Sequence, residues 1–453
     1  MNETTHSVRI WSIEKRVGKR RTTYYTRWKV GTQAFREGFT TYALADAFRA
    51  KLVTATRNGI AFDCKTGRPV TMQQEEAAQE TLFGFACKYV DMKWPDLSPN
   101  SRKSVSDSLI PIALASVRTP VAGSERTTAS KALRLAFNTT TRESAHPEEI
   151  AFWLRWFERN SHHVADLADP DALRKLLSAL DYNHDGHRSA ANTVRLRRTT
   201  LREVFDFARE RKLLRANPMD EVKARKTTTT LRQVDRRSVV NPVQGRTLLK
   251  AVEDINDRLS AFFALLYFAA LRPEEAANLS KRNLALPESG WGELHLEQAA
   301  PEVGSQWSDS RTRSEARALK HREDGVGRTV PCSPGLTSYL NRHLCAYGTA
   351  RDGRLFPGER SGGRLGSSVY GRVWARARTA VFTEEVQVSP LAKRPYDLRH
   401  AAVSTWLNAG VEPTRVAEWA GHSVHVLLRV YAKCLDGGEQ AARQRVQDLL
   451  GDA

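Results

Sequence analysis

The sequence shows two kinds of periodicity, and their order along the chain restricts the fold. Residues 7–40 contain three short runs of β-type alternation, SVRIWSI, TTYYTRWKV and TQAFREGFT, separated by turn signals. An Ala-rich helical pattern follows and ends at Gly59. Helical patterns then dominate from about residue 80 to the end, except for strand patterns between Trp291 and Pro331. We therefore expect a multidomain, mainly α protein that begins with a three-stranded β-sheet plus a helix.

Polar stretches separate these regions. Residues 63–79 and the stretch KARKTTTTLRQVDRRS, residues 223–238, have the composition of linkers. The strand patterns of the last region are WGELHLEQ, ARALKHRE and GRTVPCS, and Gly325 and Gly327 predict a tight turn between the last two. The expected domains are therefore residues 1–62, a helical domain at 80–222, and a mostly helical domain with a small antiparallel sheet at 239–453.

Composition favours a polyanionic partner inside the cell. The 453 residues include 70 Lys and Arg against 51 Asp and Glu, a net charge of +19. Five scattered cysteines without a CxxC pair argue against a disulfide framework or a zinc site, and for a reducing cytoplasm. The longest apolar run, Ala261 to Leu271, is too short to span a bilayer and predicts a buried helix.

Two segments carry basic residues in patterns that suit nucleic-acid binding. The N-terminal strands mix basic and aromatic residues, and either a DNA-binding ribbon or a solvated basic face fits this pattern. A second segment, AANTVRLRRTTLREVFDFARERKLL, predicts an amphipathic helix whose arginines either face DNA or are simply solvated. Its apolar face comprises Val194, Leu201, Val204, Phe205 and Ala208. The candidate DNA-binding residues of the two segments are Arg20, Arg21, Arg27, Lys29, Arg195, Arg198 and Arg202.

The residue pattern richest in chemistry is YDLRHAAVSTWLNAGVEPTRVAEWAGHSVHVLLRVY, residues 396–431. It contains Arg399, a Gly-His pair ending at His422, and Tyr431 nine residues after that histidine. Far upstream, the motif LRPEE contains Arg272. Cleavage of a phosphodiester requires charge stabilisation at phosphorus, an activated nucleophile and a protonated leaving group. Guanidinium groups bind two phosphate oxygens in a fixed geometry, and a phenol can serve as the nucleophile once its proton is removed.

In order and spacing, these motifs resemble those of the tyrosine recombinases, also called the phage integrase family. The matching residues extend from Arg272 to Tyr431, and weaker similarity covers nearly the whole chain. The resemblance implies that Arg272 and Arg399 bind the scissile phosphate, that His422 hydrogen-bonds it, and that Tyr431 forms a 3′-phosphotyrosyl intermediate. No cofactor and no divalent metal is needed for this chemistry.

The resemblance also implies roles for three neighbouring residues. Lys320, in the basic strand–turn–strand ALKHREDGVGRTVP, would protonate the 5′-oxygen leaving group, although Arg322 is an alternative because the turn is long. Glu275 would hold Arg272, or merely favour the helix N-terminus. His400 would be a structural or supporting group.

One position departs from the family pattern. The residue three before Arg399 is usually histidine, and here it is Tyr396. A phenol can donate a hydrogen bond to a phosphate but is a poor proton acceptor near neutral pH. The base for Tyr431 is therefore open: His422 could serve, or proton removal could be assisted electrostatically.

The family implies an arm-type DNA-binding domain, a core-binding domain and a catalytic domain. The protein would be an integrase of a phage or mobile element, acting as a homotetramer on double-stranded attachment sites, with a directionality factor and a DNA-bending protein as further partners. Three rivals remain at this level: a non-catalytic DNA-binding protein with the same fold, a type IB topoisomerase, and a transposon recombinase or telomere resolvase with the same active site. The attachment sites, the origin of the element and the need for accessory factors cannot be read from the sequence.

Overall fold

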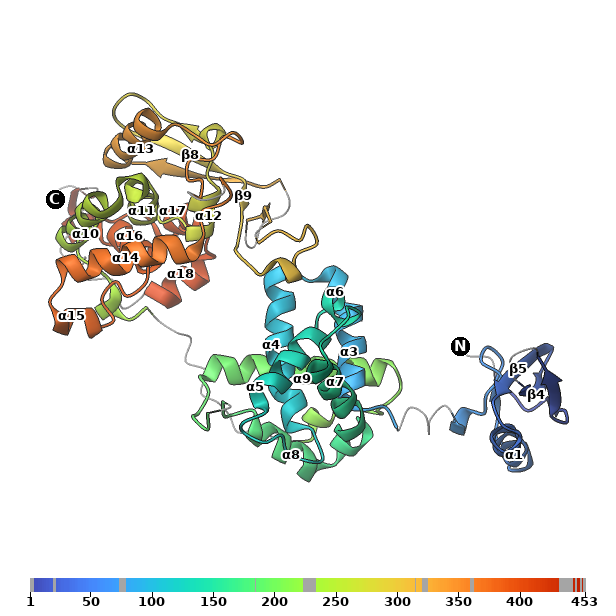
Figure 1. Cartoon of the computed structure of the whole chain (residues 1–453). Coiled ribbons are helices and arrows are strands. Elements are labelled where there is room, and N and C mark those ends of the chain that lie inside the picture. The colour runs from blue at the N-terminus through green and yellow to red at the C-terminus, as the bar shows by residue number, and fades with distance from the viewer. Residues whose placement is uncertain are drawn as a thin grey trace. The chain divides into compact units, whose positions relative to one another are not determined.

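The computed structural model describes residues 4–18, 22–72, 79–183, 185–222, 234–313, 315–319, 325–358, 362–431, 443–444, 446–448 and 450. The chain divides into two compact units with a boundary near residue 227. As the sequence predicts, it is mainly α-helical with small antiparallel sheets, one of them N-terminal (Figure 1). Among the helices of the described ranges, none has the length and apolarity to cross a membrane.

The N-terminal sheet has four strands where three are expected. Its antiparallel strands are β2 (Val8–Ile10), β3 (Glu14–Val17), β4 (Thr22–Val30) and β5 (Gln33–Phe39). β2 lies within the first predicted run, residues 7–13, whereas β3 is an additional strand that follows this run; both pair with β4. The two strands are separated because residues 11–13 stand opposite only two residues of β4, 26 and 27. One extra residue of this kind makes a bulge, which bends a strand and interrupts its pairing.

Helix α1 (Tyr42–Arg57) packs against this sheet and completes a small core. Strand alternation places Trp28 of β4 in that core, together with Phe48 and Leu52 of α1. The core also includes Met72, and the Gly67 carbonyl accepts a hydrogen bond from the Trp28 indole. The folded part of this region therefore extends beyond residue 62, into the stretch expected to be a linker.

The middle of the chain is a group of helices. They are α3 (Leu82–Lys93), α4 (Pro99–Ala115), α5 (Arg126–Ala136), α6 (Thr139–Arg142), α7 (Glu148–Asn160), α8 (Pro170–Ala179) and α9 (Ala191–Glu210). Helix α9 is the amphipathic helix of the sequence analysis. All five residues of its predicted apolar face are buried. Between α3 and α9, the buried Tyr89 donates a hydrogen bond of 2.6 Å to the Glu203 carboxylate.

The second unit is built from helices around a small sheet. Its helices are α10 (Pro242–Asn256), α11 (Ser260–Phe268), α12 (Pro273–Asn278), α13 (Pro334–Tyr347), α14 (Ser367–Val381), α15 (Glu384–Val388), α16 (Asp397–Asn408), α17 (Pro413–Ala420) and α18 (Val424–Tyr431). Helix α11 is almost wholly buried, as its apolar sequence predicts. Because α11 is fixed in the core, it also fixes the position of Arg272, which follows it closely.

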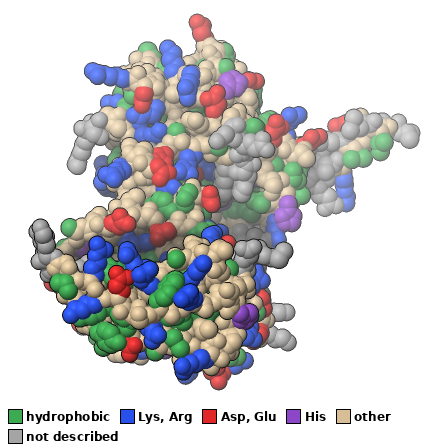
Figure 2. Space-filling model, turned by 90° about the vertical axis from the view of Figure 1, so that its right-hand side faces the viewer, with side chains coloured by type: hydrophobic (Ala, Val, Ile, Leu, Met, Phe, Trp, Pro, Cys, Tyr) green, Lys and Arg blue, Asp and Glu red, His purple; other side chains and the backbone are tan. Residues whose placement is uncertain are grey.

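The strands of this unit pair differently from the predicted succession. β11 (Arg328–Cys332) pairs with β8 (Gly292–Leu296), which also pairs with β7 (Leu284–Ala285). A separate pair joins β9 (Gln298–Ala299) to β10 (Arg317–Ala318). The pairing of β11 with β8 matches their buried alternate positions, among them Val330 opposite Leu294. Across the surface, Lys and Arg side chains are scattered over the face shown in Figure 2.

Candidate active site

The residues singled out in residues 396–431 converge with Arg272 inside the second unit. Arg272 stands at the N-terminus of α12, and Arg399 and His400 lie in the first turn of α16. His422 follows Gly421, the residue that caps the C-terminus of α17. Tyr431 is the last residue of α18. Four helices separated in sequence therefore bring two arginines, two histidines and a tyrosine to one place.

Glu275 is a buried acid of this cluster, and it holds two arginines. Its carboxylate accepts hydrogen bonds from the Arg272 backbone N–H at 2.8 Å and from the Arg272 Nη1 at 2.8 Å. It also accepts two from Arg328, at 2.9 Å from Nη1 and 2.7 Å from Nη2. Burial alone would raise the pKa of Glu275, but Arg328 and Arg272 outweigh it and lower the pKa to about 2. Glu275 is therefore a fixed anion.

Arg272 is fixed at both ends of its guanidinium. Pro273 at the first helical position suits a helix start, and the Glu275 side chain returns to the Arg272 N–H. Its Nη2 donates to the Gly421 carbonyl at 3.0 Å, which links α12 to the turn before His422. Burial opposes the charge of Arg272, but Glu275 more than compensates and its pKa is raised.

Arg328 is a member of the cluster that the sequence analysis missed. It shares the buried face of β11 with Val330 and Cys332, and its side chain is only 1% exposed. Besides Glu275, it donates from Nε to the Trp419 carbonyl at 3.0 Å. A signal was present in GRTVPCS, because a charged residue in register with two inward-facing apolar residues needs a buried partner.

Arg399 is completely buried and contacts two segments, the one before α12 and the end of α17 with the turn that follows it. Its Nη1 donates to the Ala270 carbonyl, and its Nη2 donates to the Ala420 carbonyl and lies 2.8 Å from His422 Nε2. Burial lowers the pKa of Arg399, and the charge of Arg272 adds to this effect. Because arginine is a donor only, His422 Nε2 must accept and the ring proton of a neutral His422 must be on Nδ1.

The Gly421-His422 pair combines a neutral buried histidine with a glycine in a left-handed conformation. Burial lowers the pKa of His422 to about 3, and Arg399 adds to that shift, so the ring is neutral at pH 7. Gly421 ends α17 with a φ of +63°, a left-handed conformation that favours glycine. A Cβ at Gly421 would lie 3.0 Å from Arg328 Nη1. The Gly-His pair therefore meets a conformational and a steric requirement at once.

Tyr431 lies between the two histidines and is only 1% exposed. Its hydroxyl is 2.8 Å from His400 Nδ1. Its ring stacks at 6.0 Å on His422 with an interplanar angle of 30°. Burial lowers the pKa of His400 to about 4, against an opposing effect of Asp397. His400 thus contacts the hydroxyl of Tyr431 directly.

Tyr396 and Lys320 are the remaining residues that the sequence analysis predicted to be catalytic. Tyr396 packs its ring edge against His400, at 5.2 Å between ring centroids, and lies 6.0 Å from the Arg399 guanidinium carbon. Lys320 and its alternative Arg322 lie outside the described residues, so their role stays a prediction. Within the described ranges, no group of three or more His, Cys, Asp or Glu side chains is placed to hold a metal ion.

The candidate DNA-binding residues fall into three groups. Arg27, Lys29, Arg195 and Arg202 are exposed. Arg198 is instead paired with Asp181 at 2.7 Å and only 14% exposed, which indicates a packing role in the helical region. Arg20 and Arg21 lie outside the described residues.

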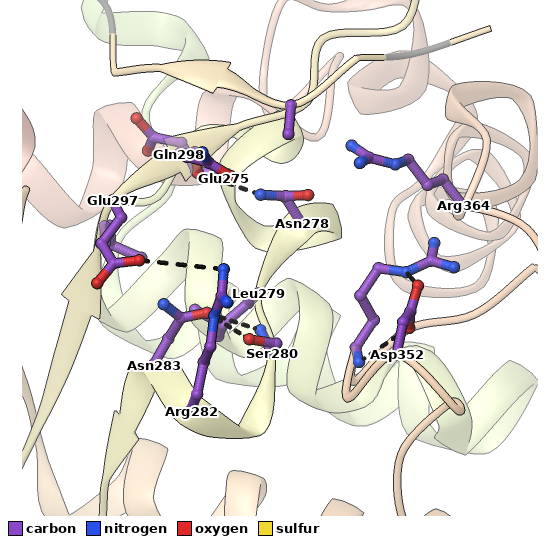
Figure 3. A pocket seen from close by; sticks show the side chains of 13 residues that line it. Glu275, Asn278, Leu279, Ser280, Arg282, Asn283, Glu297, Gln298, Asp352 and Arg364 are labelled. Carbon is purple, nitrogen blue, oxygen red and sulfur yellow. Dashed lines mark hydrogen bonds and ion pairs between the residues drawn. The ribbon is translucent and has the colours of Figure 1, made fainter. Parts of the chain in front are cut away.

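Glu275 also borders a polar pocket of about 170 Å³ (Figure 3). Its walls include Asn278, Ser280 and Asp352, and Arg364 extends toward it from the connection between α13 and α14. Among the described residues that line it, neither Arg399 nor Tyr431 occurs. The pocket therefore adjoins Glu275, which holds Arg272, and is not lined by Tyr431.

Comparisons with known proteins give only distant similarities. No protein-family model matches the sequence, and no curated protein sequence is significantly similar. Among solved structures, the Tn1549 transposon integrase in complex with transposon right end DNA is 16% identical, with a TM-score of 0.48, covering 72% of this chain and 99% of that chain. The XerH site-specific recombinase bound to difH substrate is 15% identical, with a TM-score of 0.46 and coverages of 83% and 97%.

A lambda integrase dimer bound to a COC′ core site is 13% identical, with a TM-score of 0.44 and coverages of 90% and 91%. All three are tyrosine recombinases, the family whose motifs this sequence resembles.

Proposed function

We propose that this protein is a tyrosine site-specific DNA recombinase, which cleaves and rejoins DNA through a 3′-phosphotyrosyl intermediate. The observation that carries the proposal is the convergence of Arg272, Arg399 and His422 beside Tyr431. These are the groups that a metal-free phosphoryl transfer to a phenol requires.

The cluster has donors available for an anion. Within the described part of the chain, Arg399 Nε and His422 Nδ1 are buried without a hydrogen-bond partner. A buried donor without a partner costs about 1–3 kcal/mol, and a phosphate oxygen would remove that cost at both atoms. Arg272, Arg328 and Arg399 are three cations against the single Glu275 carboxylate, so the site has an excess of positive charge that a phosphodiester would neutralise.

This geometry and the family resemblance together suggest the following roles. Arg272 and Arg399 would bind the non-bridging oxygens and His422 would donate to one of them. Glu275 and Arg328 would hold Arg272 in place. Tyr431 would attack phosphorus, Tyr396 would contact the phosphate, and Lys320 would protonate the departing 5′-oxygen.

The wider assembly is part of the proposal. The exposed Arg27 and Lys29 of β4 and the exposed Arg195 and Arg202 of α9 would contact DNA phosphates, consistent with the net charge of +19. The protein would act as a homotetramer on attachment sites of a phage or mobile element, in the cytoplasm. A directionality factor and a DNA-bending protein would be further partners.

Covalent trapping tests the proposal. Wild type and Tyr431→Phe are expressed in a bacterium that carries the element's DNA, cells are lysed in detergent, and the 3′ ends of protein-linked fragments are sequenced. We expect discrete ends with the wild type and none with Tyr431→Phe. DNA binding without any adduct would indicate a non-catalytic DNA-binding protein. Adducts accompanied by relaxation of supercoils, without joining of two duplexes, would indicate a topoisomerase.

A further inference from the structure

We propose that His400 is the general base that takes the proton from the Tyr431 hydroxyl when the tyrosine attacks DNA. The inference rests on the proposed function and assigns a catalytic residue that the sequence motifs left open. The contact that carries it is the 2.8 Å distance between His400 Nδ1 and the Tyr431 hydroxyl oxygen. A general base must lie within about 2.6–3.2 Å of the atom that loses the proton.

His422 cannot fill this role in the same arrangement. The lone pair of its Nε2 is engaged by Arg399 Nη2 at 2.8 Å, so Nδ1 carries the ring proton and is a donor. Its ring stacks on the Tyr431 ring, with its centroid 6.0 Å away. His422 is thus set to donate to a phosphate.

Among the described residues, the other titratable groups near the tyrosine are also unsuited. Tyr396 is a phenol and accepts protons poorly at neutral pH. Asp397 is buried and already accepts from the Arg394 backbone N–H at 2.8 Å and from Arg394 Nη2 at 2.9 Å. Glu275 is engaged by Arg272 and Arg328. His400 is therefore the base that this arrangement offers.

The protonation state of His400 agrees with the role. Burial lowers its pKa to about 4, so the imidazole is neutral at pH 7 and its Nδ1 lone pair can accept the hydroxyl proton. The imidazolium that forms would be stabilised by the bound phosphate anion, which arrives with the substrate. Tyr396, packed edge-on at 5.2 Å, holds the His400 ring from its other side.

The step balances without a further reactant. The O–H bond of Tyr431 breaks and its proton moves to His400 Nδ1, while the phenol oxygen forms a bond to phosphorus. The bond from phosphorus to the 5′-oxygen breaks, and that oxygen takes a proton from the general acid, assigned above to Lys320. In rejoining, the 5′-hydroxyl attacks phosphorus, and the departing Tyr431 oxygen recovers its proton from His400.

The test measures single-turnover cleavage of a duplex that carries the trapped crossover sequence, with a nick that blocks religation. His400→Asn keeps a hydrogen-bond acceptor near Nδ1 but removes the basicity. We expect cleavage to slow by about 10²–10⁴-fold with unchanged DNA binding. His425→Asn, at an exposed histidine of the same helix as Tyr431, is the matched control and is expected to cleave like the wild type.

A second readout separates proton transfer from positioning. A fluorinated tyrosine incorporated at residue 431 has a lower phenol pKa and needs less help from a base. Fluorotyrosine should raise the cleavage rate of His400→Asn at least tenfold. It should not raise the cleavage rate of His422→Asn. His400→Gln serves if His400→Asn does not fold.

Near-wild-type cleavage by His400→Asn, or a defect that fluorotyrosine leaves unchanged, would overturn the proposal for His400. Absence of any adduct from wild-type protein would instead overturn the proposed function. The two failures are therefore distinguishable.

Discussion

The buried Glu275 carboxylate allows a quantitative prediction for Glu275→Gln. The carboxylate accepts four hydrogen bonds of 2.7–2.9 Å, two from Arg272 and two from Arg328. Glutamine has one acceptor oxygen, so its NH₂ group would face two of these donors. Two buried donors left unpaired cost about 2–6 kcal/mol in total, in line with the 3–5 kcal/mol typical of a broken buried ion pair. We therefore expect the free energy of unfolding of the second unit to fall by about 4 kcal/mol.

Thermal unfolding of the full chain measures this loss. For a unit of this size, about 4 kcal/mol corresponds to a decrease of roughly 10 °C in the Tm of its transition. Glu274→Gln is the matched control, since Glu274 is a neighbouring, only partly buried acid in the same helical turn, and we expect it to change Tm by less than about 2 °C. Added phosphate should raise the Tm of Glu275→Gln more than that of the wild type, because the variant has a larger uncompensated positive charge. Equal Tm values for the two variants would refute the assigned role of Glu275.

Three other predictions follow from single features. In Gly421→Ala, a residue with a Cβ must adopt a left-handed conformation, and that Cβ would lie 3.0 Å from Arg328 Nη1. We therefore expect DNA cleavage to be lost and the free energy of unfolding to fall by at least about 1–2 kcal/mol. Normal cleavage by this variant would contradict the prediction. Folding lowers the pKa of His400 from 6.5 to about 4 and the pKa of His422 from 6.5 to about 3. At a pH between these lowered values and 6.5, the unfolded chain therefore binds more protons than the folded chain. Stability measured in urea should therefore be full above pH 6.5 and decline as pH falls toward 4, by up to about 3 kcal/mol for His400 alone; a flat profile would argue against neutral buried histidines. Trp28→Ala should destabilise the N-terminal sheet by about 3–5 kcal/mol and leave the transition of the second unit in place, which calorimetry can resolve.

The parts of the fold predicted well from sequence are those where one pattern decides the structure alone. The apolar face of helix α9 includes Val194, Leu201 and Val204, and α11 is apolar around almost its whole circumference. In both cases burial follows from composition and the helical period, without knowledge of the rest of the chain. The residues of the candidate site were predicted from their resemblance to tyrosine recombinase motifs, and Arg399, His422 and Tyr431 lie together in the structure. Their catalytic roles stay predictions.

The parts that were missed depend on contacts distant in sequence. The pairing of β11 with β8 is set by a register that neither strand encodes by itself. The bulge between β2 and the additional strand β3 appears only once β4 is placed opposite them. Arg328 reaches Glu275 across 53 positions, and His400 reaches Tyr431 across 31. Such partners follow from tertiary structure, because a local pattern does not specify which distant residue completes a buried pair.

The central claim is that the Tyr431 oxygen becomes covalently bound to DNA. The most direct measurement is mass spectrometry of the protein recovered from trapped, nuclease-treated complexes. A peptide containing residue 431 should carry a nucleotide attached through its 3′-phosphate to the tyrosine, and this peptide should be absent from Tyr431→Phe. A nucleotide attached to any other side chain, or to Tyr431 through a 5′-phosphate, would contradict the account.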